Sequence, residues 1–241
     1  MTNLVTGGTT SKGNHAPKLV ALVPSHNESL WVPDVLKVLV QVDGIDEILC
    51  VDDGSTDGTP EIIRRQFPQV RVLALPSNRG KAAAILAGLV ETQSEYILML
   101  DADLLRLNRN DLESGIRKVR SDPEIDMLLF IRHPELWWAK LLRGNDLFSG
   151  ERILRREDLL KVLGGKPVHG YQLEVAINKF MIDNKKKVRR MLLRCQPVLA
   201  AIKRGFREGS KKELRMVRSI FAFIGVRGFI RQYIWFPPVL S

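Results

Sequence analysis

Short apolar runs alternate with amphipathic stretches between Lys18 and Asp101. Uninterrupted apolar runs that end at a proline or an acidic residue are typical of strands buried on both faces. Two strands of this kind are predicted at Leu19–Pro24 and Ile48–Val51, and two further strands at Val70–Leu75 and Tyr96–Leu100. Helical spacing or helix-start residues predict three helices between them, at Leu30–Val42, from Thr59-Pro60 onward, with Thr59 as N-cap, and at Lys81–Glu91.

This alternation predicts an α/β fold, with a mostly parallel sheet flanked by helices on both faces. Ligands of such sheets bind at the carboxyl ends of the strands. Three polar segments stand at the ends of predicted strands: Pro24–Glu28, Asp52–Asp57 and Asp101–Asp103. We therefore expect them to meet at one edge of the sheet.

The pattern is less regular after Asp103. Strands are predicted at Met127–Ile131 and Phe148–Leu154, and helices at Asp111–Arg120, Arg156–Val162 and Tyr171–Asn184. We expect a flexible tail at residues 1–16, a main domain at 17–183 with halves 17–105 and 106–183, and a basic, aromatic-rich helical extension at 184–241.

Composition excludes several classes of protein. A chain of 241 residues that is 45% hydrophobic can bury a full core without disulfides. Its two cysteines, Cys50 and Cys195, form no metal-binding or disulfide pattern, so a reducing, cytoplasmic setting is expected. No apolar run reaches the roughly 18–20 residues that cross a bilayer. A secreted mini-protein, a transmembrane channel and a coiled coil are therefore excluded.

Positive charge is concentrated in the last quarter of the chain. The formal net charge is +10, but residues 184–241 contain 15 Lys or Arg and only two acids, whereas residues 1–183 carry a net charge of −3. A membrane-docking extension, a surface for an anionic acceptor and a nucleic-acid-binding surface all fit this distribution. Nucleic acid is the least favoured partner, because no DNA- or RNA-binding motif accompanies the charge.

Asp101 and Asp103 follow the predicted strand at Tyr96–Leu100. In an extended chain the side chains at positions i and i+2 point the same way, so both carboxylates can face one hard cation. Such oxygen ligands suit Mg²⁺ or Mn²⁺, particularly when substrate phosphates complete the coordination shell. A pair of acids in a solvated turn is the alternative interpretation.

Residues 51–59, VDDGSTDGT, place acids and hydroxyls between glycines. A turn that caps the following helix needs only one or two of these side chains. We therefore interpret Asp52 and Asp53 as acceptors for a ribose hydroxyl or a base N–H. Further along, residues 78–81 (NRGK) open a helix whose N-terminus, with Lys81, favours an anion. An ordinary helix start is the alternative there.

The order LVPSHNE at 22–28, VDDGSTDGT, NRGKAAAILAGL at 78–89 and DAD at 101–103 resembles the nucleotide-binding half of the family 2 glycosyltransferases. The resemblance is close over residues 18–105, although His26 stands where these enzymes usually have an aromatic residue. It implies the GT-A fold, a sugar donor linked to UDP or GDP, and a Mg²⁺ or Mn²⁺ cofactor. A cation that bridges the diphosphate oxygens neutralises charge on the leaving group.

The resemblance also implies roles for individual residues. The donor site would be lined by Pro24, Asn27, Glu28, Asp52, Asp53, Lys81, Asp101 and Asp103. Asp101 and Asp103 would approach the ribose, the diphosphate and the metal, with Asp103 the stronger candidate for a direct metal ligand.

Residues 149–156 (SGERILRR) and 170–174 (GYQLE) look like the acceptor side of two kinds of enzyme. These are the polyprenyl (dolichyl) phosphate sugar transferases and the glucosyl-3-phosphoglycerate synthases, whose acceptors carry a phosphate or a carboxylate. Arg152, Arg155 and Arg156 are consistent with gripping such a group. A solvated helix face is the alternative for Arg155 and Arg156.

Glu174 stands where many family 2 enzymes have their catalytic acid, although Gln172 and Leu173 replace the usual acidic neighbour. The resemblance thus gives Glu174, Arg152 and Asp103 as catalytic candidates. For Glu174 the alternatives are to cap a helix or to orient Arg152. His169 is a candidate third metal ligand or acceptor contact, and a loop histidine with neither role is the alternative.

Residues 203–236 mix basic and aromatic side chains, which suits a helix lying in the plane of an anionic membrane surface. Packing against the main domain or a second subunit, as in a homo-oligomer, is the alternative, because Arg215, Arg218, Arg227 and Arg231 do not share one helical face.

Three functions are consistent with these features. The leading one is metal-assisted transfer of a hexose from a nucleotide sugar to an anionic, lipid-linked acceptor such as a polyprenyl phosphate, in the cytoplasm at the inner face of the membrane. The second keeps the donor but uses a small soluble acceptor such as 3-phosphoglycerate. The third is a nucleotide-binding or scaffold protein without transfer activity.

Overall fold

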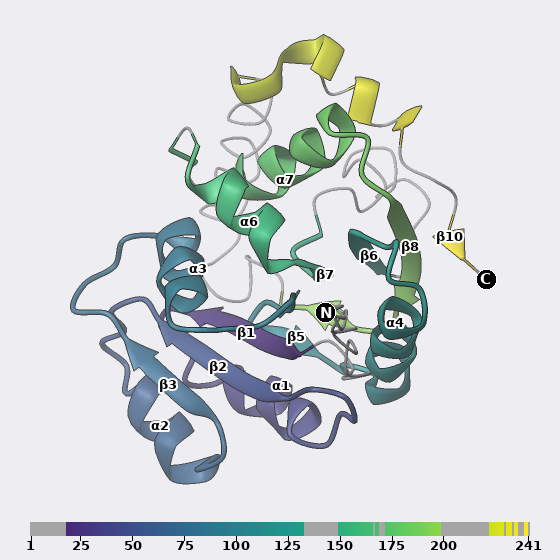
Figure 1. Cartoon of the computed structure of the whole chain (residues 1–241). Coiled ribbons are helices and arrows are strands. Elements are labelled where there is room, and N and C mark those ends of the chain that lie inside the picture. Colours follow the sequence, from purple (N-terminus) through teal and green to yellow (C-terminus); the bar gives the residue numbers. More distant parts are fainter. Residues whose placement is uncertain are drawn as a thin grey trace, which may run out of the picture.

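The computed structural model describes residues 18–132, 149–165, 167–168, 172–198, 222–228, 230–232, 234–235 and 239–240 (Figure 1). Its strands are β1 (Leu19–Ser25), β2 (Glu47–Asp52), β3 (Arg71–Ala74), β4 (Tyr96–Met99), β5 (Leu104–Leu105), β6 (Met127–Arg132), β7 (Arg152–Arg155), β8 (Val188–Leu193), β9 (Gln196–Pro197) and β10 (Val239–Leu240). Its helices are α1 (Val32–Leu39), α2 (Thr59–Gln66), α3 (Lys81–Val90), α4 (Arg109–Ser121), α6 (Arg156–Leu163) and α7 (Gln172–Asp183).

Eight strands form one sheet in the order β10-β8-β6-β7-β4-β1-β2-β3, and β5 pairs with β9 in a separate ribbon. Strand β7 runs antiparallel to both of its neighbours, β4 and β6. The other neighbouring strands of the large sheet pair in parallel. The predicted class, a mostly parallel sheet with helices, is therefore confirmed.

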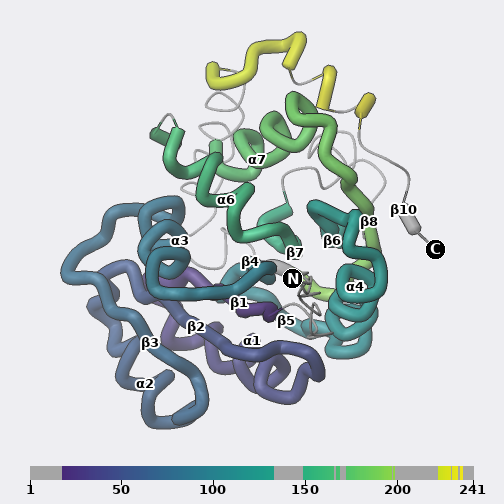
Figure 2. Tube along the Cα trace, in the orientation of Figure 1, coloured from purple at the N-terminus to yellow at the C-terminus, as the bar shows by residue number. Residues whose placement is uncertain are grey.

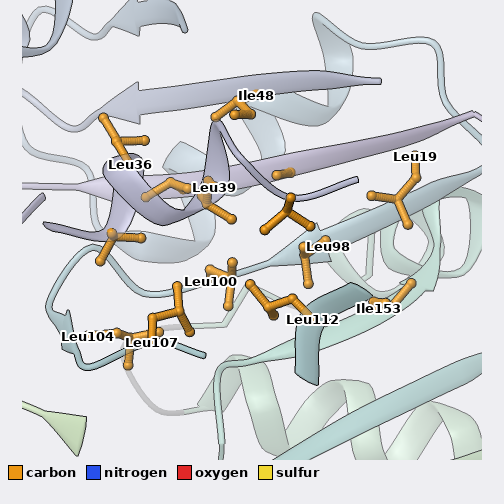
Figure 3. Packing of buried hydrophobic residues seen from close by; sticks show 14 of the residues in the cluster. Leu19, Leu36, Leu39, Ile48, Leu98, Leu100, Leu104, Leu107, Leu112 and Ile153 are labelled. Atoms are coloured by element: carbon orange, nitrogen blue, oxygen red, sulfur yellow. The ribbon is translucent and has the colours of Figure 1, made fainter. Parts of the chain in front are cut away.

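Two apolar layers hold the helices against opposite faces of this sheet. Alternate residues of β1 divide between them: Leu19, Ala21 and Val23 pack in one layer, and Val20 and Leu22 in the other. The first layer, shown in Figure 3, contains the buried faces of α1 and α4, and the second those of α3, α6 and α7. Because successive side chains of a strand point to opposite faces, an uninterrupted apolar run is what a doubly covered strand requires.

The four strands and three helices predicted before residue 101 are all present, with ends shifted by a few residues. One shift matters for the site. The N-cap of α2 is Gly58, at φ 79°, and Thr59, predicted as the N-cap, is the first helical residue.

The predicted domain boundary after residue 183 is wrong. Strand β8, at Val188–Leu193, lies inside the main sheet and pairs in parallel with β6 over its whole length. The sequence VRRMLL does not have the apolar character of β1 and β4, because the middle of β8 is only half-buried. The expected tail at residues 1–16 lies outside the described residues.

Between β8 and β10, which belong to the main sheet, the described part of the C-terminal extension lies against α7 (Figure 2). Helical residues 222–228 and 230–232 run beside this helix, where Arg231 donates to Asp183 at 2.8 Å. Among the helices in the described ranges, none has the length and hydropathy that a bilayer crossing demands.

Candidate active site

The parallel strands end together at one edge of the sheet. Register pairs Ser25 with Asp52, Asp52 with Ala74, and Leu22 with Met99. The segments that follow, at residues 25–31, 52–59, 75–81 and 100–103, therefore share this edge, which we call the rim. The convergence expected from the strand order is present. Pro24 belongs to it as well, because it lies beyond Leu22, the last residue of β1 that pairs with β4.

Hydrogen bonds join the loop after β1 to the loop after β2. Asn27, at φ 56°, donates from its backbone N to Ser55 Oγ at 2.8 Å, and its Oδ1 accepts from the backbone N of Thr56 at 2.8 Å. The backbone N of Glu28 donates to Thr59 Oγ1 at 3.0 Å. The hydroxyls of residues 51–59 thus fix the positions of Asn27 and Glu28.

Asp52 and Asp53 are buried, and each has an internal partner. Asp52 accepts from the hydroxyl and the backbone N of Ser55, at 2.5 and 3.0 Å. Asp53 accepts from the backbone N of Arg79 at 2.8 Å and of Gly80 at 2.7 Å, which fixes the start of α3. The prediction assumed that the turn does not need Asp52 and Asp53. This assumption is wrong, because both side chains hold the loops of the rim in place.

Lys81 is the first residue of α3 and bridges two acids from distant parts of the chain. Its Nζ donates to Asp101 Oδ1 at 2.7 Å and to Glu174 Oε1 at 2.8 Å. The side chains of Lys81, Asp101 and Glu174 are 27%, 32% and 5% exposed. Burial alone would lower the pKa of Lys81, but the two carboxylates outweigh it and raise that pKa. Lys81 therefore carries a positive charge that is already paired.

The DAD motif differs from its predicted geometry. Strand β4 ends at Met99, and Ala102 and Asp103 lie in a turn. The alternation rule for an extended chain therefore does not apply to Asp101 and Asp103. Both are partly exposed.

The donor set at Asp101 and Asp103 fits a hard divalent cation that shares its remaining positions with phosphate oxygens and water. Gly150 leaves the room that this requires: a Cβ there would lie 3.0 Å from both carboxylate oxygens of Asp101 and 2.9 Å from Lys81 Nζ. Within the described ranges, no three His, Cys, Asp or Glu side chains form a group that could hold a metal ion. His169, the candidate third ligand, lies outside those ranges.

The start of β7 brings two buried residues to the rim: Arg152, which was predicted from the sequence, and Glu151, which was not. Glu151 and Arg152 are fully buried next to Asp101 and Glu174. Burial raises the pKa of Glu151; the charge of Arg132 opposes this effect and that of Asp101 adds to it. We call Lys81, Asp101, Glu151, Arg152 and Glu174 the charged cluster. The Oε1 of Glu151, the Nε of Arg152 and the Oε2 of Glu174 have no hydrogen-bond partner in the described part of the chain.

Arg152 does not grip an acceptor in this structure, because no part of it is exposed. Its guanidinium donates to the carbonyl of Ser149 and, at 3.2 Å, to Asn178 Oδ1. Burial lowers the pKa of Arg152, while Glu174, Glu151 and Asp101 act in the opposite direction. Arg152 is therefore a buried counter-charge beneath the rim carboxylates, which agrees with the alternative that Glu174 orients it.

Arg155 and Arg156 lie at the opposite edge of the sheet. Because β7 is antiparallel to β4, Arg152 pairs with Met99 and Arg155 with Tyr96. Arg155 donates to Asp126 at 3.1 Å and stacks over Tyr96, and Arg156 donates to the carbonyl of Leu89 at 2.8 and 3.1 Å. The predicted cluster of three acceptor-binding arginines is therefore wrong for these two residues.

The model of the family described as glycosyl transferase family 2 matches residues 20–180. The chain belongs to this family. The match covers the rim, the charged cluster and most of the sheet, and it confirms the resemblance found in the sequence.

Curated relatives match a shorter part of the chain. A dolichyl-phosphate beta-glucosyltransferase of Trichomonas vaginalis is 38% identical over 94 residues, which cover 34% of this chain and 28% of the relative. An undecaprenyl-phosphate 4-deoxy-4-formamido-L-arabinose transferase of Pseudomonas syringae is 38% identical over 97 residues, covering 36% and 28%. These matches span less than a third of each relative's length.

Solved structures share the GT-A fold over most of the chain. Glucosyl-3-phosphoglycerate synthase from Mycobacterium tuberculosis, crystallised with Mn²⁺, UDP and phosphoglyceric acid, has a TM-score of 0.68 at 18% identity, covering 86% of this chain and 78% of that one. A mannosyltransferase from Pyrobaculum calidifontis, in complex with GDP-Man and Mn²⁺, has a TM-score of 0.68 at 23% identity, covering 87% and 64%.

Lys81→Met should destabilise the fold, because it leaves Asp101 and the nearly buried Glu174 without their shared cation. We expect a loss of about 1–3 kcal/mol in the free energy of unfolding at neutral pH, measured by urea denaturation. Lys37→Met is the matched control, since Lys37 forms only an exposed ion pair with Asp34 and should change stability by less than about 0.5 kcal/mol. Equal effects of the two substitutions would contradict this role of Lys81.

Asp57 should stabilise the rim in a pH-dependent way. Although burial would raise it, the pKa of Asp57 is lowered to about 2 by hydrogen bonds from Thr59 and Ser29. The stabilisation is complete above the unfolded pKa of about 4 and is lost as the pH falls towards 2. Thermal unfolding should therefore show Asp57→Ala to be less stable than the wild type at pH 6, with the difference shrinking between pH 4 and pH 2. A difference that does not change with pH would refute the assignment.

Proposed function

We propose that the protein transfers a hexose from a nucleotide-diphosphate sugar to an anionic acceptor, with assistance from Mg²⁺ or Mn²⁺. The observation that carries the proposal is the gathering of Asp101, Glu174 and Lys81 at the rim of a family 2 fold. Matches to relatives named as dolichyl-phosphate and undecaprenyl-phosphate sugar transferases favour a polyprenyl phosphate as the acceptor.

On the donor side, the loops after β1 and β2 would bind the nucleoside. Pro24, Asn27 and Glu28 stand at the end of β1, and Asp52 and Asp53 at the end of β2. A carboxylate oxygen can accept more than one hydrogen bond. Asp52 can therefore hold Ser55 and still accept from a base N–H, while Asp53 keeps the NRGK segment in position.

Asp101 and Asp103 would hold the cation, with Asp103 the more direct ligand. When bound, a divalent cation neutralises the negative charge that develops on a departing diphosphate. Lys81 is placed to add a second positive charge beside it, since its ammonium group already lies 2.7 Å from Asp101. Both charges act in a partly buried site, where electrostatic stabilisation of a leaving group is stronger than in water.

The state of Glu174 favours a phosphate acceptor over a hydroxyl. A hydroxyl must lose its proton to a general base, whereas an ionised phosphate is already a nucleophile. Glu174 is 5% exposed and its Oε1 accepts from Lys81. We therefore assign Glu174 to holding Lys81 and balancing Arg152, and the nucleophile to the acceptor's own oxygen.

Binding of UDP or GDP should depend on the metal through Asp103. In thermal-shift assays the wild type should gain several degrees with one of the two nucleotides, and more with Mn²⁺ present, because a ligand stabilises the state that binds it. Asp103→Ala should lose the Mn²⁺-dependent part of the shift and at least about 100-fold in transfer activity.

The matched control is Glu124→Ala, which removes an exposed acid at the opposite edge of the sheet. It should behave like the wild type. If neither nucleotide shifts the wild-type protein, with or without metal, the donor assignment is wrong. Transfer to 3-phosphoglycerate but not to a polyprenyl phosphate would instead select the soluble acceptor.

The C-terminal extension would place the enzyme at an anionic membrane surface on the cytoplasmic side. Val226, Ile230 and Ile234, spaced four residues apart, are 63%, 50% and 75% exposed. Arg227 and Arg231 are exposed between them. Exposed apolar side chains beside arginines suit the boundary between lipid headgroups and acyl chains.

The protein should therefore float with vesicles that contain anionic phosphatidylserine. We expect the bound fraction to fall sharply when Val226, Ile230 and Ile234 are all changed to Ser, and to fall in high salt, since each basic residue near the surface contributes about 1 kcal/mol. Leu30→Ser is the control, because Leu30 is equally exposed but lies on the loop before α1. Flotation that is unaffected by the triple change would exclude this surface.

A further inference from the structure

A chain of buried polar groups links the C-terminal extension to the charged cluster. Gln232 is buried against α7, where its Nε2 donates to the carbonyl of Val175 at 3.1 Å and its Oε1 accepts from Asn178 Nδ2 at 3.4 Å. Asn178 is fully buried, and its Oδ1 accepts from Arg152 at 3.2 Å. Three side chains far apart in the sequence are thus connected in series.

Helix α7 carries the middle member of this connection, Asn178. Glu174 and Asn178 are four residues apart, so they lie on the same face of the helix, towards Arg152. Glu174 is within electrostatic range of Arg152, and Asn178 hydrogen-bonds it. A shift of Asn178 would therefore move the guanidinium relative to Glu174, which holds Lys81.

At the other end, Arg152 holds the segment that touches Asp101 and Lys81. The guanidinium donates to the carbonyl of Ser149, and the next residue is Gly150. A Cβ on Gly150 would lie about 3 Å from Lys81 Nζ and from both carboxylate oxygens of Asp101. The backbone at Gly150 thus lies beside the Asp101–Lys81 pair, so a displacement of this segment towards the pair would disturb it.

We propose that Gln232 is a positioning residue for the active site, which acts through Asn178 on Arg152 and through Arg152 on the segment at residues 149–152. The inference rests on the proposed transferase function for its catalytic consequence. It gives the extension a second role: its outward side chains face the solvent, while Gln232, on the same short segment, fixes the geometry beneath the rim.

Gln232→Leu tests the proposal, because it keeps the approximate size of the side chain and removes both hydrogen bonds. We expect kcat for sugar transfer to fall about tenfold, which corresponds to about 1.4 kcal/mol. The donor KM and the affinity for UDP or GDP should stay within about twofold, because the loops after β1 and β2 are held by other bonds. A role only in stability would lower the melting temperature without this separation of kcat from KM.

A double-mutant cycle with Asn178→Leu identifies the route. If Gln232 acts through Asn178, the double variant should have the same kcat as Asn178→Leu alone. Asp183→Asn is the matched control: it removes the charge by which Asp183 of α7 holds Arg231 of the extension, and it leaves both hydrogen bonds of Gln232 in place. It should leave kcat unchanged. If the fold-losses in kcat of the two single variants multiply in the double variant, the proposal is overturned.

A spectroscopic measurement separates this inference from the transferase assignment. The Nε–H resonance of Arg152 is assigned by comparing arginine-labelled wild type with Arg152→Lys. It should shift in Gln232→Leu but not in Asp183→Asn. If the resonance does not shift in Gln232→Leu, the connection between Gln232 and Arg152 is overturned, even where sugar transfer is observed. A shifted resonance in a protein that transfers no sugar overturns the transferase function and leaves the link standing.

If Gln232→Leu does not fold, Gln232→Glu gives the second test. A carboxylate at this position can still accept from Asn178 but cannot donate to Val175. We expect it to retain most of the wild-type kcat and the Arg152 resonance. A kcat as low as that of Asn178→Leu would contradict the proposed route.

Discussion

The pairing of Lys81 with Asp101 and Glu174 is the interaction on which the site depends. It joins the start of α3, the end of β4 and the first turn of α7 at one ammonium group. The three acids of the charged cluster, Asp101, Glu151 and Glu174, would repel one another without nearby positive charge. Lys81 supplies that charge at the rim, and the fully buried Arg152 supplies it from the interior. Together they offset the repulsion between the acids.

Reversal of a single strand explains how Arg152 reaches that position. In an all-parallel sheet the start of a strand lies at the edge opposite the ligand site. Strand β7 runs the other way, so its first residue pairs with the last residue of β4. Ser149, Gly150 and Glu151 therefore enter the rim, whereas Arg155 leaves it at the far edge. The same reversal places α6, which follows at once, against the layer that contains α3 and α7.

The sequence was sufficient to predict those features that depend on a local pattern of residues. The apolar runs predicted β1, β2, β3 and β4, and the order of motifs predicted the family and the convergence at the rim. It was insufficient where a role depends on a partner far along the chain. Asp53 accepts from Gly80, and Glu174 from Lys81, across separations that no local pattern encodes. Glu151 was missed for the same reason, and antiparallel pairing at the start of β7 is the signal that would have identified it.

The burial of Glu151 and Arg152 is hard to explain by stability alone. Apolar side chains of similar volume in place of a buried ion pair are often neutral or stabilising, because removing two charges from water is expensive. Here both side chains lie close to Asp101, and one polar atom of each, Glu151 Oε1 and Arg152 Nε, lacks a hydrogen-bond partner among the described residues. Perturbed, desolvated charges concentrated at one edge of a sheet are typical of functional sites rather than of structural ion pairs. We therefore interpret Glu151 and Arg152 as part of the electrostatics of the rim, where Arg152 is held in place by the hydrogen bond that it donates to Asn178.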